Sequence, residues 1–342
     1  MKRIILLVVI ITTLILGANA QSGSKYKIND RIHLDGDAGW DYLSVDAVTN
    51  RLYVSHGNMV QIVDLNTNKI AGTIPDTKGV HGIAIASDLN KGFISDGRDS
   101  AVTIFDLTTM KTIEKIKVTG RNPDAILYDP FSHKVFAYNG GSSNATVIDA
   151  KTNKVIETIV LKGKPEFSVC DNKGLVYVNI EDKNLIAVIN STTLKVEKYF
   201  SVSPGDEPSG LALDNENHRL FAVCGNKMMM VLNAETGDVV ANLTIGDRVD
   251  GVAFDTDLKR AYSSNGDGTM TVVQQENKDK YTVIENTQTQ KGARTIAVNS
   301  KTHHIYLPCA DFGPAPKATT ENPHPRPATK PNSFTILDIV PL

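Results

Sequence analysis

A short apolar run recurs along this chain, and its regular spacing constrains the fold more than any other feature. The seven copies are YLSVD at Tyr42, GIAIA at Gly82, AILYD at Ala125, FSVCD at Phe167, GLALD at Gly210, GVAFD at Gly251 and TIAVN at Thr295. They begin at intervals of 40 to 44 residues. A repeat of this length is typical of a propeller blade, a unit that cannot bury its own faces and therefore stacks on its neighbours.

Each repeat contains four short strand-like runs. A second run such as RLYVSH follows the first, a third such as VQIVDL comes next, and a fourth such as KIAGTIP alternates more weakly. Runs rich in β-branched and aromatic residues between Asn, Asp and Gly turns indicate strands. The sequence therefore predicts an all-β fold, a seven-bladed β-propeller with four-stranded blades. The seventh unit has only three such runs, so we expect the N-terminal strand at residues 25–34 to close the last blade.

Residues 1–20 have the composition of a secretory signal peptide. A basic start precedes an apolar run from Ile4 to Leu16, and small residues follow. The run is shorter than the roughly 20 residues that a membrane span needs, so we expect cleavage near Ala20. Residues 21–342 then form one propeller domain, and we expect a periplasmic or secreted monomer with no membrane span.

Charge, cysteine content and motifs argue against several functions. Without the signal peptide the chain has 34 basic and 38 acidic residues, a net charge of about −4, which opposes a nucleic-acid-binding surface. The three cysteines lie far apart in apolar runs, so we expect buried free thiols and no disulfide framework. The sequence has no Gly-rich phosphate loop, G-x-S-x-G elbow or H-E-x-x-H motif. We expect no cofactor.

The repeats resemble a known type of propeller unit. RLYVSH with the preceding DAVTN, together with GLVYVNI and KTNKVIETI, resembles the YVTN-type repeat, which is WD40-like. The chain after residue 20 resembles the YncE family of exported bacterial propellers. This repeat is structural, and the family shares no universal chemistry. Resemblance to the family's namesake implies single-stranded DNA binding as one alternative function.

The residue just before each inner strand is predicted to stand on the rim of the channel mouth, on the face here termed the top face. All seven of these residues are polar: Asp41, His81, Asp124, Glu166, Ser209, Asp250 and Arg294. They form either a solvated rim or a ligand site. Carboxylates gathered around one axis raise each other's pKa unless a cation offsets them. Four acids beside one arginine favour a cation, a metal or a hydroxyl-rich ligand over a phosphate.

Other residues on the top face have less specific interpretations. Trp40 is either a stacking platform beside the channel or a packing residue. The loops between second and third strands share this face, and we interpret their polar residues as solvated turn residues, among them His56, Asp96, Asn139 and Glu181.

The repeat pattern is broken once, between HHIYLPC and SFTILDI in the last unit. Residues 310–332 are rich in proline and would join the second and third strands of the last blade on the top face. The prolines stiffen this segment and lower the entropy that it loses on ordering. It is either a disordered linker or a lid that brings Phe312, Glu321, His324 and Arg326 toward the rim.

Three functions remain open. We favour a non-enzymatic protein that binds a small molecule, glycan or protein at the top of the channel. The ligand-binding residues would be Trp40, Asp41, His81, Asp124, Glu166, Asp250, Arg294, Phe312, His324 and Arg326. In that case we expect no metal.

The second function is a metal-assisted hydrolase or lyase at the channel mouth, with Arg294 as an electrophilic clamp and His81 or His324 as the proton-transfer group. Its metal ligands would be Asp41, Asp124, Glu166 and Asp250. The third is single-stranded DNA binding, which needs stacking aromatics and a positive groove.

Overall fold

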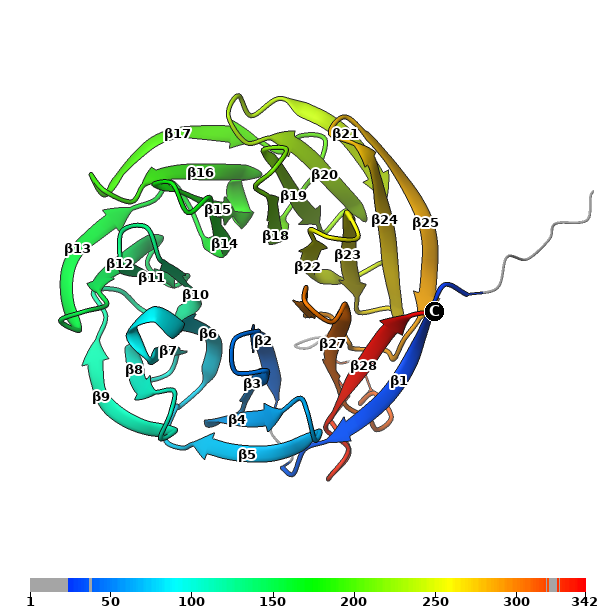
Figure 1. The fold of residues 1–342 in the computed structure, drawn as a ribbon, viewed down its shortest axis with the longest axis horizontal. Helices are drawn as coiled ribbons and strands as arrows, with labels where there is room; N and C mark the ends of the chain where they lie inside the picture. Colours follow the sequence, from blue (N-terminus) through cyan, green and yellow to red (C-terminus); the bar gives the residue numbers. More distant parts are fainter. Residues whose placement is uncertain (1–23, 37–38, 318, 320–324, 326) are drawn as a thin grey trace, which may run out of the picture.

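A computed structural model describes residues 24–36, 39–317, 319, 325 and 327–342. Within these residues, 28 strands form seven four-stranded antiparallel sheets. Figure 1 shows the sheets arranged as a ring around a central channel, with the inner strand of each sheet next to the channel. This confirms the predicted seven-bladed β-propeller.

The blades are numbered here in chain order. Blade 1 contains β2 (Trp40–Asp46), β3 (Arg51–His56), β4 (Met59–Asp64) and β5 (Lys69–Ile74), and blade 2 contains β6 (Val80–Ala86), β7 (Lys91–Asp96), β8 (Ala101–Asp106) and β9 (Lys111–Lys117). Blade 3 contains β10 (Pro123–Asp129), β11 (Lys134–Asn139), β12 (Asn144–Asp149) and β13 (Lys154–Val160), and blade 4 contains β14 (Pro165–Cys170), β15 (Leu175–Ile180), β16 (Leu185–Asn190) and β17 (Lys195–Ser201). Blade 5 contains β18 (Pro208–Asp214), β19 (Arg219–Cys224), β20 (Met228–Asn233) and β21 (Val239–Thr244), and blade 6 contains β22 (Val249–Asp255), β23 (Arg260–Asn265), β24 (Thr269–Asn277) and β25 (Lys280–Gln288). Blade 7 contains β26 (Ala297–Asn299), β27 (His304–Cys309), β28 (Thr335–Pro341) and, from the N-terminal side, β1 (Tyr26–His33).

The N-terminal strand closes the ring, as predicted. β1 pairs with β28 in antiparallel register from Tyr26 opposite Pro341 to His33 opposite Thr335. The side chain of Tyr26 also reaches blade 6, where its hydroxyl accepts a hydrogen bond of 2.7 Å from Nη1 of Arg260. The first and last strands therefore lie in one sheet, and their pairing attaches β1 to the rest of the propeller.

The hydrophobic core is divided among the contacts between neighbouring blades. Between blades 4 and 5, for example, Ile186 and Val188 pack in one buried cluster with Leu220 and Ala222. Each blade buries both faces only because it has a neighbour on each side, which is the behaviour expected of a repeat that cannot fold alone. In the part of the chain that the structure describes, no helix is both long and apolar enough to cross a membrane.

Three residues interpreted as solvated turn residues are in fact buried. His56, Asp96 and Asn139 are each at most 1% exposed, and each is the last residue of the second strand of its blade. Each hydrogen-bonds a side chain of the adjoining third strand, as in the 2.6 Å bond that Thr103 donates to Asp96. The prediction was wrong here because these side chains turn back into the blade instead of outward to solvent.

The three cysteines form no disulfide, and two of them are buried as expected. Cys224 and Cys309 lie in the core, whereas Cys170 at the end of β14 is partly exposed toward the lower part of the channel.

Candidate functional site

Buried polar side chains of the second strands hold the rim of the channel in place. The fifth residue of β7, β15 and β23 is Ser95, Asn179 and Ser264, and all three are fully buried. Each donates a hydrogen bond to a backbone carbonyl at the start of the next blade. Ser95 bonds the carbonyl of Asp124, and Ser264 bonds that of Arg294 at 2.6 Å. The positions of the rim residues are therefore set by bonds between blades.

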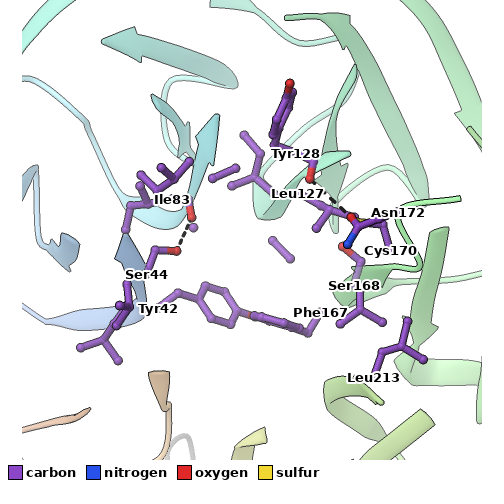
Figure 2. A pocket seen from close by; sticks show the side chains of 18 of the residues that line it. Tyr42, Ser44, Ile83, Leu127, Tyr128, Phe167, Ser168, Cys170, Asn172 and Leu213 are labelled. Atoms are coloured by element: carbon purple, nitrogen blue, oxygen red, sulfur yellow. Dashed lines mark hydrogen bonds between the residues drawn. The ribbon is translucent and has the colours of Figure 1, made fainter. Parts of the chain in front are cut away.

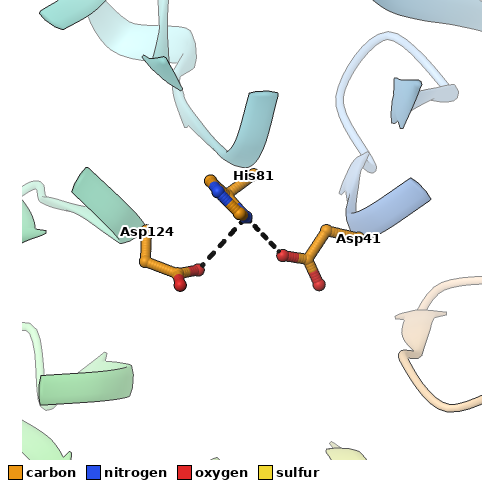
Figure 3. A group of neighbouring side chains, drawn as sticks. All are labelled: Asp41, His81 and Asp124. Atoms are coloured by element: carbon orange, nitrogen blue, oxygen red, sulfur yellow. Dashed lines mark hydrogen bonds and ion pairs between the residues drawn. The ribbon is translucent and has the colours of Figure 1, made fainter. Parts of the chain in front are cut away.

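His81 lies between two rim carboxylates (Figure 3). Its Nδ1 is 2.7 Å from Oδ2 of Asp41 and 3.6 Å from Oδ1 of Asp124. Burial lowers the pKa of the imidazole, but the hydrogen bond with Asp41 and the charge of Asp124 outweigh it, so the pKa of His81 is raised. Burial also raises the pKa of Asp124, although the charge of His81 opposes this. The arrangement favours an imidazolium held between two carboxyl groups.

Glu166 is the most buried acid of the rim, with its side chain 9% exposed. Nζ of Lys164 lies 2.6 Å from Oε1 of Glu166 and 2.5 Å from Oε2 of Glu181, which begins the single turn η2 (Glu181–Lys183). Burial and the charge of Asp124 nevertheless raise the pKa of Glu166 to about 7. Burial lowers the pKa of Lys164, but its two carboxylate partners outweigh that effect and raise it. The lysine is more exposed than Glu166 and is shared, so it offsets the charge of Glu166 only in part.

Arg294 neutralises the acids on the other side of the rim. Its Nη2 is 3.4 Å from Oδ1 of Asp41, and its Nη1 forms a close ion pair with Asp250. The hydroxyl of the next residue, Thr295, donates a 2.6 Å hydrogen bond to the carbonyl of Asp41. Arg294 thus joins blades 6, 7 and 1. The rim acids whose pKa is raised are Asp124 and Glu166, which Arg294 does not contact through an ion pair.

Two aromatic rings pack together in the channel below the rim. Tyr42 and Phe167 lie beside each other, with ring centroids 5.4 Å apart (Figure 2). Burial, followed by the charges of Asp124 and Asp41, raises the pKa of Tyr42 well above its ordinary value, so the phenol stays neutral. Below the two rings lies a cavity of about 420 Å³, lined mainly by apolar side chains of the inner strands. Tyr42 also lines the charged upper cavity, so it lies between that cavity and the mainly apolar lower one.

Trp40 has the packing role that was considered for it, and its role as a stacking platform for a ligand stays a prediction. It stacks on Phe334, with ring centroids 5.2 Å apart, and lies at a tilt against Phe312, with centroids 6.2 Å apart. It also lines the upper cavity together with Phe312.

The described ends of the proline-rich insertion lie at the channel mouth. Phe312 pairs with Thr329 through an isolated antiparallel bridge, and the amide of Lys330 donates a 2.7 Å hydrogen bond to the carbonyl of Asp311. Pro327 and Thr329 line the upper cavity with Phe312. Glu321, His324 and Arg326, which we predicted to approach the rim, lie outside the described residues.

The upper cavity has a volume of about 1050 Å³. Most of the predicted binding residues line it, namely Trp40, Asp41, Asp124, Glu166, Asp250, Arg294 and Phe312. His81 contacts two of these residues. Ser209, the remaining rim residue, is buried and does not line the cavity. The structure therefore brings together residues that are more than 250 positions apart in the sequence.

Sequence reasoning missed three charged residues of this cavity, Lys164, Arg248 and Lys291, and interpreted a fourth, Glu181, as a solvated turn residue. Lys164 stands two positions before Glu166, and Arg248 two positions before Asp250. Alternate residues of an extended chain point to the same side, so the spacing of Lys164 and Glu166 was a usable signal. Arg248 has a left-handed backbone, with φ of 55°, so the same argument does not apply to it. A search of only the residue directly before each inner strand does not find Lys164 or Arg248.

Three of the rim residues could hold a metal ion. One ligand atom each from Asp41, His81 and Asp124 lie within 4.8 Å of one another. Imidazole with two carboxylates is a donor set that suits zinc and other transition metals. Glu166 and Asp250, the other two acids of the predicted metal set, are paired with Lys164 and Arg294 instead.

These features define a class of protein, a seven-bladed β-propeller with a charged cavity at one mouth of its channel. No family model matches the sequence. No curated protein matches it either. The resemblance to the YncE family therefore stays a prediction.

Solved structures with the same fold are found at low sequence identity. The chain is similar to hydrazine synthase of Kuenenia stuttgartiensis at 16% identity and a TM-score of 0.68, over 80% of this chain and 94% of that one. It is also similar to U3-55K at 11% identity and a TM-score of 0.75, over 92% and 98% of the two chains. The WD40 repeats of RRP9 match at 11% identity and a TM-score of 0.75, over 91% and 97%. At these identities the similarity shows the fold alone.

Proposed function

We propose that this protein is an exported, non-enzymatic propeller that binds a small molecule, glycan or protein in the upper cavity of its channel. One observation carries the proposal. Asp124 and Glu166 are held close together at low exposure, so that burial raises the pKa of both. A fold that needed only packing at this position would be served by uncharged side chains, so we infer that the acids are kept for binding.

Export is supported by the composition of residues 1–20, which lie outside the described residues. The basic start, the apolar run and the small residues that follow match a cleaved signal peptide. The mass of the protein recovered from the periplasm or medium tests this, and it should correspond to a chain that begins at Gln21. A recovered mass that includes residues 1–20 would contradict export by this route.

The binding proposal is tested by thermal unfolding of the mature protein against a collection of small molecules and glycans. We expect at least one compound to raise the unfolding temperature of the wild-type protein but not that of the Asp124→Asn/Glu166→Gln variant. A variant with Glu114→Gln and Glu157→Gln on the outer strands is the matched control and should respond as the wild type does. A stabilising compound that acts equally on all three proteins would place binding elsewhere.

A second candidate, metal-assisted hydrolysis or elimination, is favoured by the arrangement of Asp41, His81 and Asp124. Titration with Zn²⁺, Mn²⁺ and Ca²⁺ tests it. Tight binding of one ion that is lost in His81→Asn would support this function. No binding of any of the three ions would remove its centre.

Single-stranded DNA binding, the third function considered, has weaker support. The mature chain is acidic overall, and carboxylates line the channel mouth. Binding of an oligonucleotide that weakens steeply with added salt would be required to sustain it.

A further inference from the structure

The charges of the upper cavity are divided between two sides of the channel. Asp124, Glu166 and Glu181 come from blades 3 and 4. Arg248 and Lys291 come from the connections that precede and follow the strands of blade 6. Figure 1 shows β10 and β14 on one side of the channel and β22 on another, with blade 5 between β14 and β22. The cavity therefore has an acidic arc and a basic arc.

Several charged residues of the cavity are paired with one another. Arg294 pairs with Asp41 and Asp250, and Lys164 pairs with Glu166 and Glu181. These pairs tie neighbouring elements together, but Glu166 and Glu181 share one lysine, so the charge of Glu166 is offset only in part.

The cavity charges that these ion pairs do not fully offset are of both signs. Arg248 and Lys291 line the cavity and form no ion pair with a residue that the structure describes, although the charge of Arg248 helps to lower the pKa of Asp267. On the acidic arc, two acids share one lysine, and Asp124 shares His81 with Asp41. A ligand cation there would relieve the mutual repulsion of Asp124 and Glu166.

A ligand with a single sign of charge fits this distribution poorly. A simple cation would satisfy Asp124 and Glu166 but would offer no negative group to Arg248 and Lys291. A phosphate would pair with Arg248 and Lys291 but would meet the acidic arc across the cavity. A molecule with an ammonium group at one end and a carboxylate at the other satisfies both arcs.

We propose that the ligand is a zwitterion, a short peptide with free termini, whose ammonium group faces Asp124 and Glu166 and whose carboxylate faces Arg248 and Lys291. This inference rests on the proposed function, since it specifies the ligand of the same cavity. The volume of about 1050 Å³ exceeds that of most small-molecule pockets and accommodates several residues. The aromatic wall of Trp40 and Phe312 lies beside the basic arc and offers apolar contact to a peptide side chain.

The experiment compares peptides whose ends are free or blocked. The probes are an equimolar set of Ala-Xaa-Ala tripeptides, the same set N-acetylated, and the same set C-amidated, each tested by thermal unfolding and then by calorimetry on the mature protein. We expect the free set to bind and each blocked set to bind at least about tenfold more weakly, the loss that corresponds to about 1.4 kcal/mol. Blocked peptides that bind as well as free ones would overturn the inference, and so would the absence of binding by any tripeptide.

Variants assign each end of the ligand to its arc. In Arg248→Ala/Lys291→Ala, the free and C-amidated sets should bind equally, because the carboxylate no longer has a partner. In Asp124→Asn/Glu166→Gln, the free and N-acetylated sets should bind equally, because the ammonium group no longer has a carboxylate partner. The matched control Lys111→Ala/Lys154→Ala removes two exposed lysines from outer strands and should preserve the wild-type preference. Peptide binding with the same preference in all the variants would overturn the assignment.

The zwitterion inference and the proposed function can fail separately. If a sugar or another uncharged compound binds the wild-type protein and Asp124→Asn/Glu166→Gln abolishes that binding, the cavity is a ligand site and the zwitterion inference is wrong. If no probe and no compound binds, both are wrong.

Discussion

Glu166 shows most clearly that this rim is held at a cost to folding. Its carboxyl is buried beside Asp124, and its pKa is raised from 4.5 to about 7 even though Lys164 is 2.6 Å away. A carboxyl whose folded pKa lies above its unfolded pKa binds protons more tightly in the folded state. Ionisation therefore destabilises the folded protein, by on the order of 3 kcal/mol for a shift of this size.

The pH dependence of stability follows from this shift. The unfolded chain loses the proton of Glu166 near pH 4.5 and the folded chain near pH 7, so its contribution to stability falls as pH rises through that window. Glu166→Gln removes the titrating group. We expect the loss of unfolding free energy between about pH 5 and pH 8 to be about 2–3 kcal/mol smaller in Glu166→Gln than in the wild type. Urea denaturation at the two pH values measures it.

Other groups with raised pKa act in the same direction but are present in both proteins. Burial raises the pKa of Asp96 to about 6, and the raised pKa of His81 makes a stabilising contribution that is lost as pH rises. Comparing the two proteins removes every contribution that does not depend on Glu166. Equal pH profiles would show that Glu166 is ionised normally and that the rim carries no such strain.

The strands and their order could be predicted from the sequence, but the charged clusters could not. A 40-residue repeat determines which runs are inner strands, and hence that Asp41, His81 and Asp124 begin three successive blades. Whether their side chains meet depends on the angle between blades, which no local pattern encodes. The pairing of Lys164 with Glu166 could more nearly be predicted from the sequence, because the two residues share one extended segment.

The bonds between blades make a separate prediction for the second strands. Ser264 of β23 is fully buried and donates a hydrogen bond to the carbonyl of Arg294 in the next blade. Ser264→Ala leaves that carbonyl without its partner, and we expect a loss of about 1–3 kcal/mol of unfolding free energy. Thr193→Ala in an exposed turn is the control and should change stability by less than about 0.5 kcal/mol. Equal effects in the two variants would mean that the bond does not hold the rim.

For the ring as a whole, closure by β1 is the feature on which every blade depends. Blade 7 has only three strands of its own, and without β1 the strand β28 would be an open edge. Exposed edges of this kind pair with other chains. The propeller is thus stabilised as one closed unit.

A shortened chain tests closure. A chain that begins at residue 35 lacks β1, and we expect it to unfold at a much lower temperature than the wild type and to aggregate. A chain that begins at residue 24 keeps β1 and should unfold as the mature protein does. Circular dichroism and size-exclusion chromatography measure both properties. A stable monomer without β1 would contradict this view of the ring.

The central claim is that the acidic rim serves binding and not folding. Its most direct test is the unfolding free energy of Asp124→Asn/Glu166→Gln beside the wild type at about pH 8, without ligand and with a compound that stabilises the wild type. We predict that the variant without ligand is at least as stable as the wild type, because two buried charges are gone, and that the compound no longer stabilises it. A variant that loses about 2 kcal/mol or more without ligand would show that the carboxylates hold the ring together, and would contradict the claim.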